Sequence, residues 1–200
     1  MTAGVIVVLG AGSASRMRGA DKLLEPVTGK PLLRLLTERA LSTGYDVLVT
    51  LPPDARRMPR AAALAELTGI RVVEVPDAAT GMSASFRAAA KQLTAATEWA
   101  MFLPGDMPEI TAGDLTAVAR AIAQDGATIA RAASDTGRPG HPVAFARVHF
   151  PALALLKGDE GARSVVAAHL EETRLVPLPG NHAVTDLDTP EDWAAWRSAQ

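Results

Sequence analysis

Apolar residues along the chain follow two different periods, and segments of the two kinds alternate. Short continuous apolar runs, such as VIVVL at positions 5–9, are typical of strands buried on both faces. Apolar residues spaced three and four positions apart are typical of helices with one buried face. The runs predict strands over residues 5–9, 46–51, 71–75, 98–103, 128–131, 143–146 and 173–177. The helical spacing predicts helices over residues 31–43, 55–67, 80–94, 111–124, 150–156, 162–170 and 190–197.

This alternation predicts an α/β fold of the three-layer α/β/α, Rossmann-like kind, with a mostly parallel sheet and helices on both faces. We expect a single domain over residues 1–200, because this length suffices for one sizeable core. Binding sites in such folds lie beyond the carboxyl ends of the strands. Residues 10–22 and 104–108 directly follow predicted strands and combine glycine or proline with charged side chains. They therefore predict the position of a site.

Some local signals refine this picture. Thr111, followed by Asp114 three positions later, predicts a capping box at the start of its helix. Pro59 lies within the helix predicted over residues 55–67, and we expect it to distort the first turns. Residues 134–140 are polar and predict a loop between two short strands.

Composition excludes several classes of function. The formal net charge is −2, which gives no overall attraction to nucleic acid or to an anionic membrane. The chain has no cysteine, and this excludes disulfides, thiolate zinc sites, iron–sulfur clusters and a cysteine nucleophile. No apolar run approaches the roughly 20 residues of a membrane span, and the apolar start lacks a basic leader. We therefore expect a cytoplasmic protein without a nucleic-acid or membrane partner.

The loop after the first predicted strand carries the elements of a phosphate cradle. Gly10, Gly12 and Ser13 allow close approach of backbone amides to a ligand, since glycine tolerates positive φ and has no side chain. Arg16 offers a planar fork of donors, and Lys22 offers a mobile point charge. The pattern predicts a polyphosphate site. The alternative is a plain strand-to-helix turn followed by solvated charges.

Two familiar phosphate motifs do not match this loop. A P-loop ends in Gly-Lys-Ser or Gly-Lys-Thr, which the loop does not contain. The dinucleotide fingerprint needs a third glycine where Ser15 stands. It also needs an acidic residue near the end of the second strand, which here ends in Thr50 and Leu51. The comparison argues against a P-loop enzyme and against a dehydrogenase.

Two acidic motifs are candidates for metal binding. Asp106 lies in LPGDMP, just past a predicted strand, and Mg²⁺ takes one or two carboxylates together with phosphate oxygens and waters. Asp186 and Asp188 are two positions apart, so both can face one side of an extended segment. The alternatives are structural: Asp106 as a cap of the next helix, and Asp188 or Thr189 as the cap of the last helix.

Several stretches together resemble a known family. LGAGSASRM at 9–17, followed by Gly19 and Lys22, is similar to the signature L-A-A/G-G-x-S-x-R-M-G-x-x-K of the MobA-like nucleotidyltransferases, which work on molybdenum cofactor. Gly10 replaces the usual alanine, and Arg18 stands where glycine is common, which leaves the role of Arg18 open. The stretches GKPL, GMSAS, GDMP and DLDTPED resemble further motifs of that family.

The resemblance implies nucleotidyl transfer with Mg²⁺ as cofactor. It implies that Arg16, Lys22 and Asp106 are catalytic, and that Asp106 and Asp188 hold the metal with Asp186 behind them. GMSAS adds a helix start whose serines suit anion or ribose contacts, although they can also be ordinary first-turn residues. The implied nucleotide-binding residues are Leu9, Gly10, Ala11, Gly12, Ser13, Arg16, Lys22, Gly81, Ser83, Ser85 and Asp106.

Two stretches resemble motifs of the cytidylyltransferase branch. These are GRPGHPV at 137–143 and GDEGAR at 158–163, and Ala11 agrees with them, since the guanylyltransferase branch resembles A-G-G there. This implies transfer of CMP from CTP to the phosphate of molybdopterin, with release of pyrophosphate. It implies that His141, Pro142 and Arg163 bind the acceptor. A structural loop histidine and a surface arginine are the alternatives.

The resemblance also implies a division of labour along the chain. Residues 1–110 would mainly bind the nucleotide, and residues 111–200 would mainly bind the acceptor and supply the second metal ligand. Other functions stay open. These are a guanylyltransferase, a nucleotidyltransferase for a sugar phosphate or methylerythritol phosphate, and a non-catalytic chaperone that delivers molybdenum cofactor to a molybdenum hydroxylase.

Overall fold

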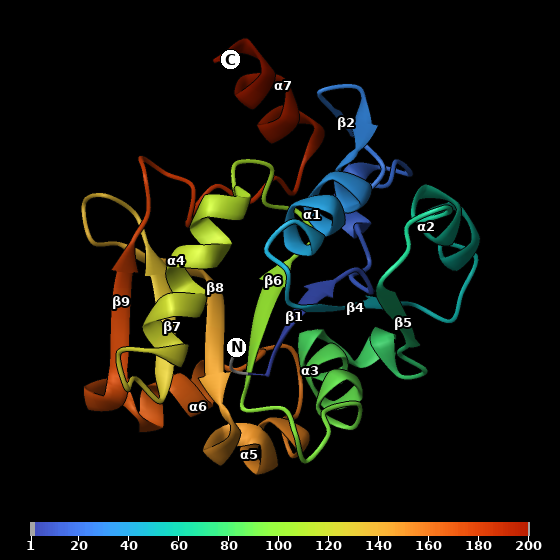
Figure 1. Cartoon of the computed structure of the whole chain (residues 1–200). Helices are drawn as coiled ribbons and strands as arrows, with labels where there is room; N and C mark the ends of the chain where they lie inside the picture. Colours follow the sequence, from blue (N-terminus) through green and yellow to red (C-terminus); the bar gives the residue numbers. More distant parts are fainter. Residues whose placement is uncertain (1–2, 200) are drawn as a thin grey trace.

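A seven-stranded sheet runs through the middle of the molecule (Figure 1). The computed structural model describes residues 3–199, and the strand order in this sheet is β5-β4-β1-β6-β8-β7-β9. All neighbouring strands pair in parallel except those on either side of β8, which runs antiparallel to β6 and β7. The mostly parallel sheet is thus confirmed. The strands are β1 (Gly4–Leu9), β4 (Asp46–Leu51), β5 (Ile70–Glu74), β6 (Trp99–Pro104), β7 (Ile129–Ala133), β8 (Pro139–Ala146) and β9 (Thr173–Pro177).

Helices cover both faces of the sheet, and the central strand β1 shows why. Ile6 and Val8 lie in the core that is shared with α1 and α4, whereas Val5 and Val7 lie in the core that is shared with α3, α5 and α6. Successive strand residues point to opposite faces, so an all-apolar strand must be covered twice. The three-layer arrangement is therefore confirmed. The helices are α1 (Leu32–Leu41), α2 (Arg57–Ala63), α3 (Met82–Ala90), α4 (Ala112–Ala123), α5 (Phe150–Ala154), α6 (Arg163–Ala168) and α7 (Pro190–Ser198).

Short elements complete the chain. A small antiparallel hairpin lies before α1, and four 3₁₀ turns lie in the connections. Among the helices of residues 3–199, none has the length and apolarity needed to cross a lipid bilayer. The short elements are β2 (Pro26–Val27), β3 (Lys30–Pro31), η1 (Ser15–Met17), η2 (Ala78–Thr80), η3 (Arg147–His149) and η4 (Leu170–Glu172).

Several predicted boundaries differ from the structure, and two of these differences have a specific physical reason. Strand β8 begins at Pro139 rather than at 143, because Pro139 pairs with Ala133 beyond an irregularity in the ladder. The loop predicted over 134–140 is correspondingly shorter. Helix α2 covers only Arg57–Ala63, so Pro59 occupies its third position. No distortion follows there, because the first amides of a helix have no intrahelical partner in any case.

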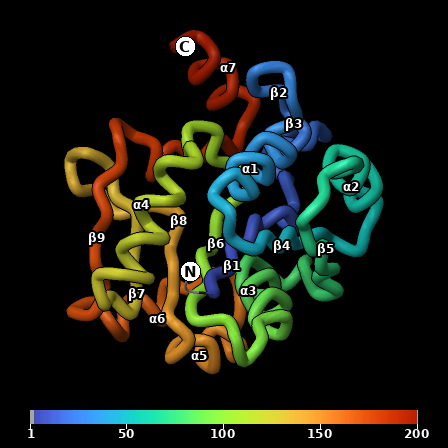
Figure 2. The backbone as a smooth tube through the Cα atoms, viewed as in Figure 1, coloured from blue at the N-terminus to red at the C-terminus, as the bar shows by residue number. Residues whose placement is uncertain are grey.

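The C-terminal segment returns across the carboxyl end of the sheet. Helix α7 lies beside the β2–β3 hairpin (Figures 1 and 2), and Arg197 Nη2 lies 2.6 Å from Glu25 Oε2. Before α7, the Leu187 amide donates a hydrogen bond of 3.1 Å to the Asp106 carbonyl. Leu187 is buried, and Thr189 begins α7 with a capping box. This path brings the second acidic motif next to the first.

Candidate functional site

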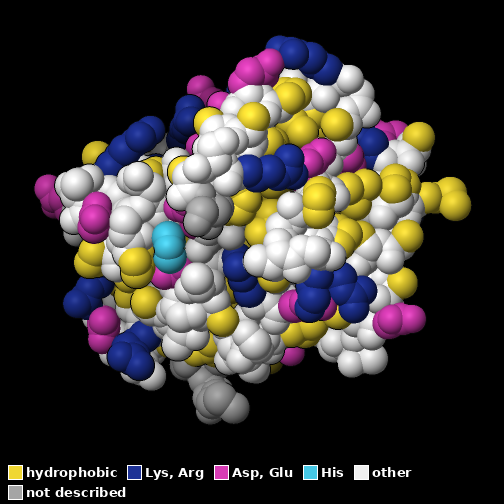
Figure 3. Space-filling model, turned by 90° about the horizontal axis from the view of Figure 1, so that it is seen from above, with side chains coloured by type: hydrophobic (Ala, Val, Ile, Leu, Met, Phe, Trp, Pro, Cys, Tyr) yellow, Lys and Arg dark blue, Asp and Glu magenta, His cyan; other side chains and the backbone are white. Residues whose placement is uncertain are grey.

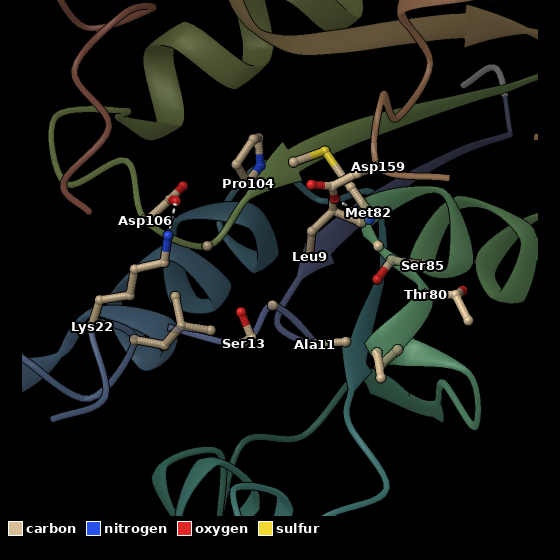
Figure 4. A pocket seen from close by; sticks show the side chains of 16 residues that line it. Leu9, Ala11, Ser13, Lys22, Thr80, Met82, Ser85, Pro104, Asp106 and Asp159 are labelled. Atoms are coloured by element: carbon tan, nitrogen blue, oxygen red, sulfur yellow. Dashed lines mark hydrogen bonds and ion pairs between the residues drawn. The ribbon is translucent and has the colours of Figure 1, made fainter. Parts of the chain in front are cut away.

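A cavity of about 370 Å³ opens at the carboxyl ends of β1 and β6 (Figure 4). The register of the sheet sets its floor, since Leu9 at the end of β1 pairs with Thr50 of β4 and with Pro104 of β6. The loop after β1, the start of α3 and the turn after β6 supply its walls. Lining residues predicted from the sequence are Leu9, Ala11, Gly12, Ser13, Lys22, Gly81, Ser85 and Asp106.

Lys22 lies between two of the predicted metal ligands. Its Nζ is 2.6 Å from Asp106 Oδ2 and 2.6 Å from Asp188 Oδ1, and Figure 4 shows its side chain directed at Asp106. Arg16 Nη2 lies 2.8 Å from Asp188 Oδ2, although most of the Arg16 side chain is exposed. Burial alone would lower the pKa of Lys22, but the two carboxylates outweigh it and raise that pKa. The structure therefore brings four predicted site residues into one charged cluster.

The carboxylates of this cluster retain capacity for a further ligand. Asp106 Oδ1 is buried and accepts no hydrogen bond from the described residues, which is costly for a charged oxygen. Asp186 is exposed at the edge of the cluster and does not line the cavity. Partial desolvation, followed by the negative charges of Asp106 and Asp188, raises the pKa of Asp186. Three acidic groups thus share a neighbourhood in which Lys22 and Arg16 supply compensating positive charge.

The two loop glycines do not act as expected. Neither Gly10 nor Gly12 adopts positive φ, and the left-handed residues of this loop are instead Ala14 and Arg18, with φ of 52° and 53°, and Gly19. A Cβ at Gly10 would lie 2.7 Å from the Thr50 carbonyl oxygen, so this position needs glycine for close packing. The tolerance of glycine for positive φ is therefore not used at Gly10 or Gly12, while the absence of a side chain at Gly10 is required.

Arg60 of α2 holds the glycine loop from outside the cavity, and sequence reasoning missed this role. The side chain is fully buried. Its Nη1 donates to the carbonyls of Gly10 and Gly12 at 2.8 and 2.9 Å. Its Nε and Nη2 form a bidentate pair with Asp21 at 2.7 and 2.9 Å. Arg56, one turn earlier, donates to Gly12 as well, at 3.0 Å. The i,i+4 spacing of the two arginines places them on one face of a helix, but which face meets the loop depends on tertiary packing.

The start of α3 only partly fulfils its predicted role. Ser85 lines the cavity, whereas Ser83 is fully buried, does not line it, and donates its hydroxyl to the Lys157 carbonyl at 3.1 Å. Asp159 accepts a hydrogen bond of 3.0 Å from the Met82 amide and also lines the cavity. A Cβ at Gly81 would lie 2.8 Å from Asp159 Cα, so this glycine permits close approach of the two segments. Asp159 was not predicted as a lining residue.

A second group of basic residues lies near enough to Asp106 to interact with it electrostatically. Burial, followed by the positive charge of Arg131, lowers the pKa of His141 to about 4, although Asp106 acts in the opposite sense and Arg163 adds to the lowering. The His141 ring is therefore neutral near pH 7. Its amide donates to the Ala183 carbonyl at 2.8 Å, and Pro142 after it is buried within β8. The structure thus brings His141 and Arg163 into one neighbourhood and adds Arg131, which the sequence reasoning missed.

The comparisons with known proteins agree with this geometry. The family described as the MobA-like NTP transferase domain matches residues 6–173. The chain belongs to this family. It is a nucleotidyltransferase of the MobA-like kind, as the sequence motifs predicted, and the predicted reaction class is confirmed at this level.

Individual relatives match over almost the whole chain. The molybdenum cofactor guanylyltransferase of Yersinia pseudotuberculosis serotype O:1b (strain IP 31758) is 28% identical over 197 residues, which cover 95% of this chain and 93% of that protein. The crystal structure of Rv0371c from Mycobacterium tuberculosis H37Rv superposes with a TM-score of 0.84 at 29% identity, over 97% of this chain and 96% of that one. A structure of Rv0371c in complex with manganese has a TM-score of 0.81 at 27% identity and covers both chains fully.

Proposed function

We propose that this MobA-like nucleotidyltransferase transfers CMP from CTP to the terminal phosphate of a molybdopterin-type acceptor and releases pyrophosphate. Family membership supplies the reaction class. The observation that carries the assignment is the cluster in which Lys22 lies 2.6 Å from both Asp106 and Asp188, at the mouth of a cavity of about 370 Å³. The ammonium of such a cluster can pair with triphosphate oxygens, and its carboxylates can hold the cation that accompanies a triphosphate.

The bonds that form and break in this reaction indicate what the nucleotide-binding and the acceptor-binding residues must each do. An oxygen of the acceptor phosphate attacks the α-phosphorus of CTP and forms a new P–O bond. The bond between the α-phosphorus and the oxygen that joins it to the β-phosphorus breaks at the same time. Pyrophosphate leaves with that electron pair, so no covalent protein nucleophile is needed. The protein contributes alignment and charge stabilisation, as in other phosphoryl transfers. In this proposal the amides of residues 11–13, with Arg16 and Lys22, bind the triphosphate, and His141 and Arg163, with Arg131, face the acceptor.

The donor set fits a divalent metal. Asp106 and Asp188 already converge on one cation, the Lys22 ammonium, and Asp106 Oδ1 has no hydrogen-bond partner among the described residues. Carboxylate oxygens combined with phosphate oxygens are what Mg²⁺ prefers. Asp106 and Asp188 would hold it, with Asp186 behind them, and the metal would neutralise phosphate charge. Lys22, released from the carboxylates, would then pair with the phosphates. The manganese complex of Rv0371c supports a divalent cation in this family.

The choice of base rests on Ala11. Its side chain is buried against Val75 and Ala84 at the wall of the cavity. A methyl group here reduces the room for a base, which favours the smaller pyrimidine. The second candidate is guanylyl transfer, and it is favoured by the relatives at 28% identity that are molybdenum cofactor guanylyltransferases. A molybdenum hydroxylase would be the recipient of a cytidylylated product.

Pyrophosphate release separates these possibilities. The purified protein would be given Mg²⁺ and molybdenum cofactor, with CTP, GTP, ATP and UTP in separate reactions. Release with CTP alone is the expected result. Release with GTP would preserve the reaction class and overturn the interpretation of Ala11, His141 and Arg163. Tight nucleotide binding without release for any nucleotide would favour a chaperone, and release only with a sugar phosphate or methylerythritol phosphate would replace the acceptor.

A further inference from the structure

His149, His169 and Glu172 gather at the end of the sheet opposite to the catalytic cavity. His149 ends η3, which follows β8, and Glu172 ends η4, directly before β9. Figure 1 shows α6 close to the start of β9. Each side chain offers one metal-ligating atom, and these atoms lie within 4.8 Å of one another. Nothing in the proposed transfer reaction uses this group.

His149 is the buried member, and it has an unused nitrogen. Its side chain is only 3% exposed, and its Nε2 is buried without a hydrogen-bond partner among the described residues. An unpartnered buried polar atom is energetically costly, so it calls for a ligand. Burial, followed by the charge of His169, lowers the pKa of His149.

His169 and Glu172 are already spaced like ligands of one ion. His169 Nδ1 lies 3.0 Å from Glu172 Oε1. Ligands at the usual zinc distances in a tetrahedral site are about 3.3 Å apart. The ligand atom of His149 lies within 4.8 Å of the other two, so it would have to move closer by at most about 1.5 Å to reach the same spacing. The Thr128 hydroxyl donates to Glu172 Oε2 at 2.8 Å and so orients the carboxylate, as the outer partners of metal ligands commonly do.

We propose that His149, His169 and Glu172 form a zinc-binding site that is separate from the catalytic carboxylates. Two imidazoles and one carboxylate suit Zn²⁺, whereas Mg²⁺ prefers oxygen ligands alone. His169 and Glu172 are partly exposed, which gives the ion an entry path and leaves room for a water as fourth ligand. The ion would join η3 to η4 and thereby stabilise the edge strand β9 at its start.

The test measures Zn²⁺ binding by tag-free protein, because a histidine tag would itself bind the metal. Millimolar Mg²⁺ is present throughout to occupy the oxygen-rich catalytic site. We expect one Zn²⁺ per chain, a rise in the melting temperature, and a tetrahedral absorption spectrum when Co²⁺ replaces Zn²⁺. His169→Gln and Glu172→Gln should each weaken zinc binding by about tenfold or more. Both side chains are partly exposed, so these variants should fold normally, which circular dichroism checks.

Two control variants locate the ion. Glu171→Gln changes an exposed neighbour outside the group and should bind zinc like the wild type. Asp188→Asn removes a catalytic carboxylate and should also retain the ion. The proposal is overturned if the wild type binds no Zn²⁺ at micromolar metal, if His169→Gln and Glu172→Gln bind it unchanged, or if Asp188→Asn abolishes binding. None of these outcomes depends on pyrophosphate release, so the proposed transfer reaction stands or fails separately.

Discussion

Lys22 acts as an internal counter-ion for the acidic cluster. Replacing it by methionine keeps the length of the side chain but removes the charge that lies 2.6 Å from Asp106 and Asp188. Turnover should fall by about 100-fold or more, because the charge proposed to stabilise the phosphates is lost. At the same time Lys22→Met should bind Mg²⁺ more tightly than the wild type in the absence of nucleotide, because the competing ammonium is gone. Steady-state kinetics and Mg²⁺ titration measure the two effects.

Lys30→Met is the matched control for this variant. Lys30 is half-exposed and pairs with Glu38 on α1, away from the cavity. It should leave both turnover and Mg²⁺ affinity unchanged. Turnover of Lys22→Met close to that of the wild type would remove Lys22 from the mechanism.

Arg60 makes a second prediction at the scale of single residues. Arg60→Met would leave Asp21 and the carbonyls of Gly10 and Gly12 without their buried donor. Breaking a buried pair of this kind costs about 3–5 kcal/mol of unfolding free energy. Arg57→Met on the same helix removes a half-exposed pair with Glu74 and should cost at most about 1 kcal/mol. Urea denaturation of both variants measures these losses of unfolding free energy. Equal losses would show that the buried contacts of Arg60 contribute no more than an exposed ion pair.

The cost of changing Arg60 should also be visible in catalysis. Arg60→Lys keeps the charge but cannot reproduce the bidentate pair with Asp21 and the two contacts to loop carbonyls. We expect its KM for the nucleotide to rise more than its kcat falls, since the loop proposed to bind the triphosphate is loosened while the reacting groups remain. A fall in kcat with unchanged KM would contradict this positioning role.

At the scale of elements, the start of β8 and the segment 181–188 depend on each other. A Cβ at Gly140 would overlap the Ala183 backbone, while the adjacent His141 amide donates to the Ala183 carbonyl at 2.8 Å. Gly140→Ala should therefore displace the segment that carries Asp188. We expect a loss of about 1–3 kcal/mol in stability, as for other overpacked sites, together with reduced turnover. Thermal unfolding and the pyrophosphate assay measure both.

Gly113→Ala serves as its counterpart. Gly113 lies within α4, and its added Cβ would make only an ordinary contact, 3.6 Å from Thr111 Oγ1. This variant should gain about 0.4–1 kcal/mol, because alanine loses less chain entropy than glycine on folding. Full turnover in a destabilised Gly140→Ala protein would show that Asp188 is not displaced.

Elements with one dominant physical cause were predictable from sequence. Residues 5–9 are a continuous apolar run, and residues 47–51 are apolar except for Thr50. Both are buried strands, because only a strand covered on both faces can hide them. Residues 139–142, with two prolines and a glycine, resemble a loop. They form a strand because Ala133, across the intervening turn, pairs with Pro139, and because the distant Ala183 carbonyl accepts the His141 amide. Local propensity cannot register such partners.

In the candidate site, too, some residues could be predicted from the sequence and others could not. That Lys22, Asp106 and Asp188 lie together agrees with the rule that sites form at the carboxyl ends of parallel strands, and with the family motifs. The rule says nothing about Arg60, because α2 could present either face to the loop. Ser83 was misplaced for a related reason. The first turn of α3 packs against residues 157–159, which turns this hydroxyl away from the cavity.

At the scale of the whole molecule, positive and negative side chains are interspersed, and the net charge is small. The face seen from above in Figure 3 mixes Lys and Arg with Asp and Glu side chains, which agrees with a formal net charge of −2. The charge clusters around the cavity therefore act over short distances. Their effect on folding should be visible in how stability depends on pH.

His141 gives this dependence a definite sign. Its pKa is lowered from 6.5 to about 4 in the folded protein, so between these values the unfolded chain binds more protons. The stability that this residue contributes is present above pH 6.5 and is lost as the pH falls toward 4. Urea unfolding across this range should give a flatter profile for His141→Gln than for the wild type. An NMR titration in which the His141 ring titrates near pH 6.5 would contradict the prediction.

The contact between α2 and the glycine loop has a consequence for protein engineering. Because Arg60 and Arg56 hold the carbonyls of Gly10 and Gly12, the loop takes its shape partly from a helix more than forty positions further along the chain. A graft of residues 9–22 from a guanylyltransferase would therefore lack the helix that contacts this loop in its protein of origin. The transferable unit for exchanging base preference is the loop together with residues 54–63, and a chimera that carries both should fold where the loop alone does not.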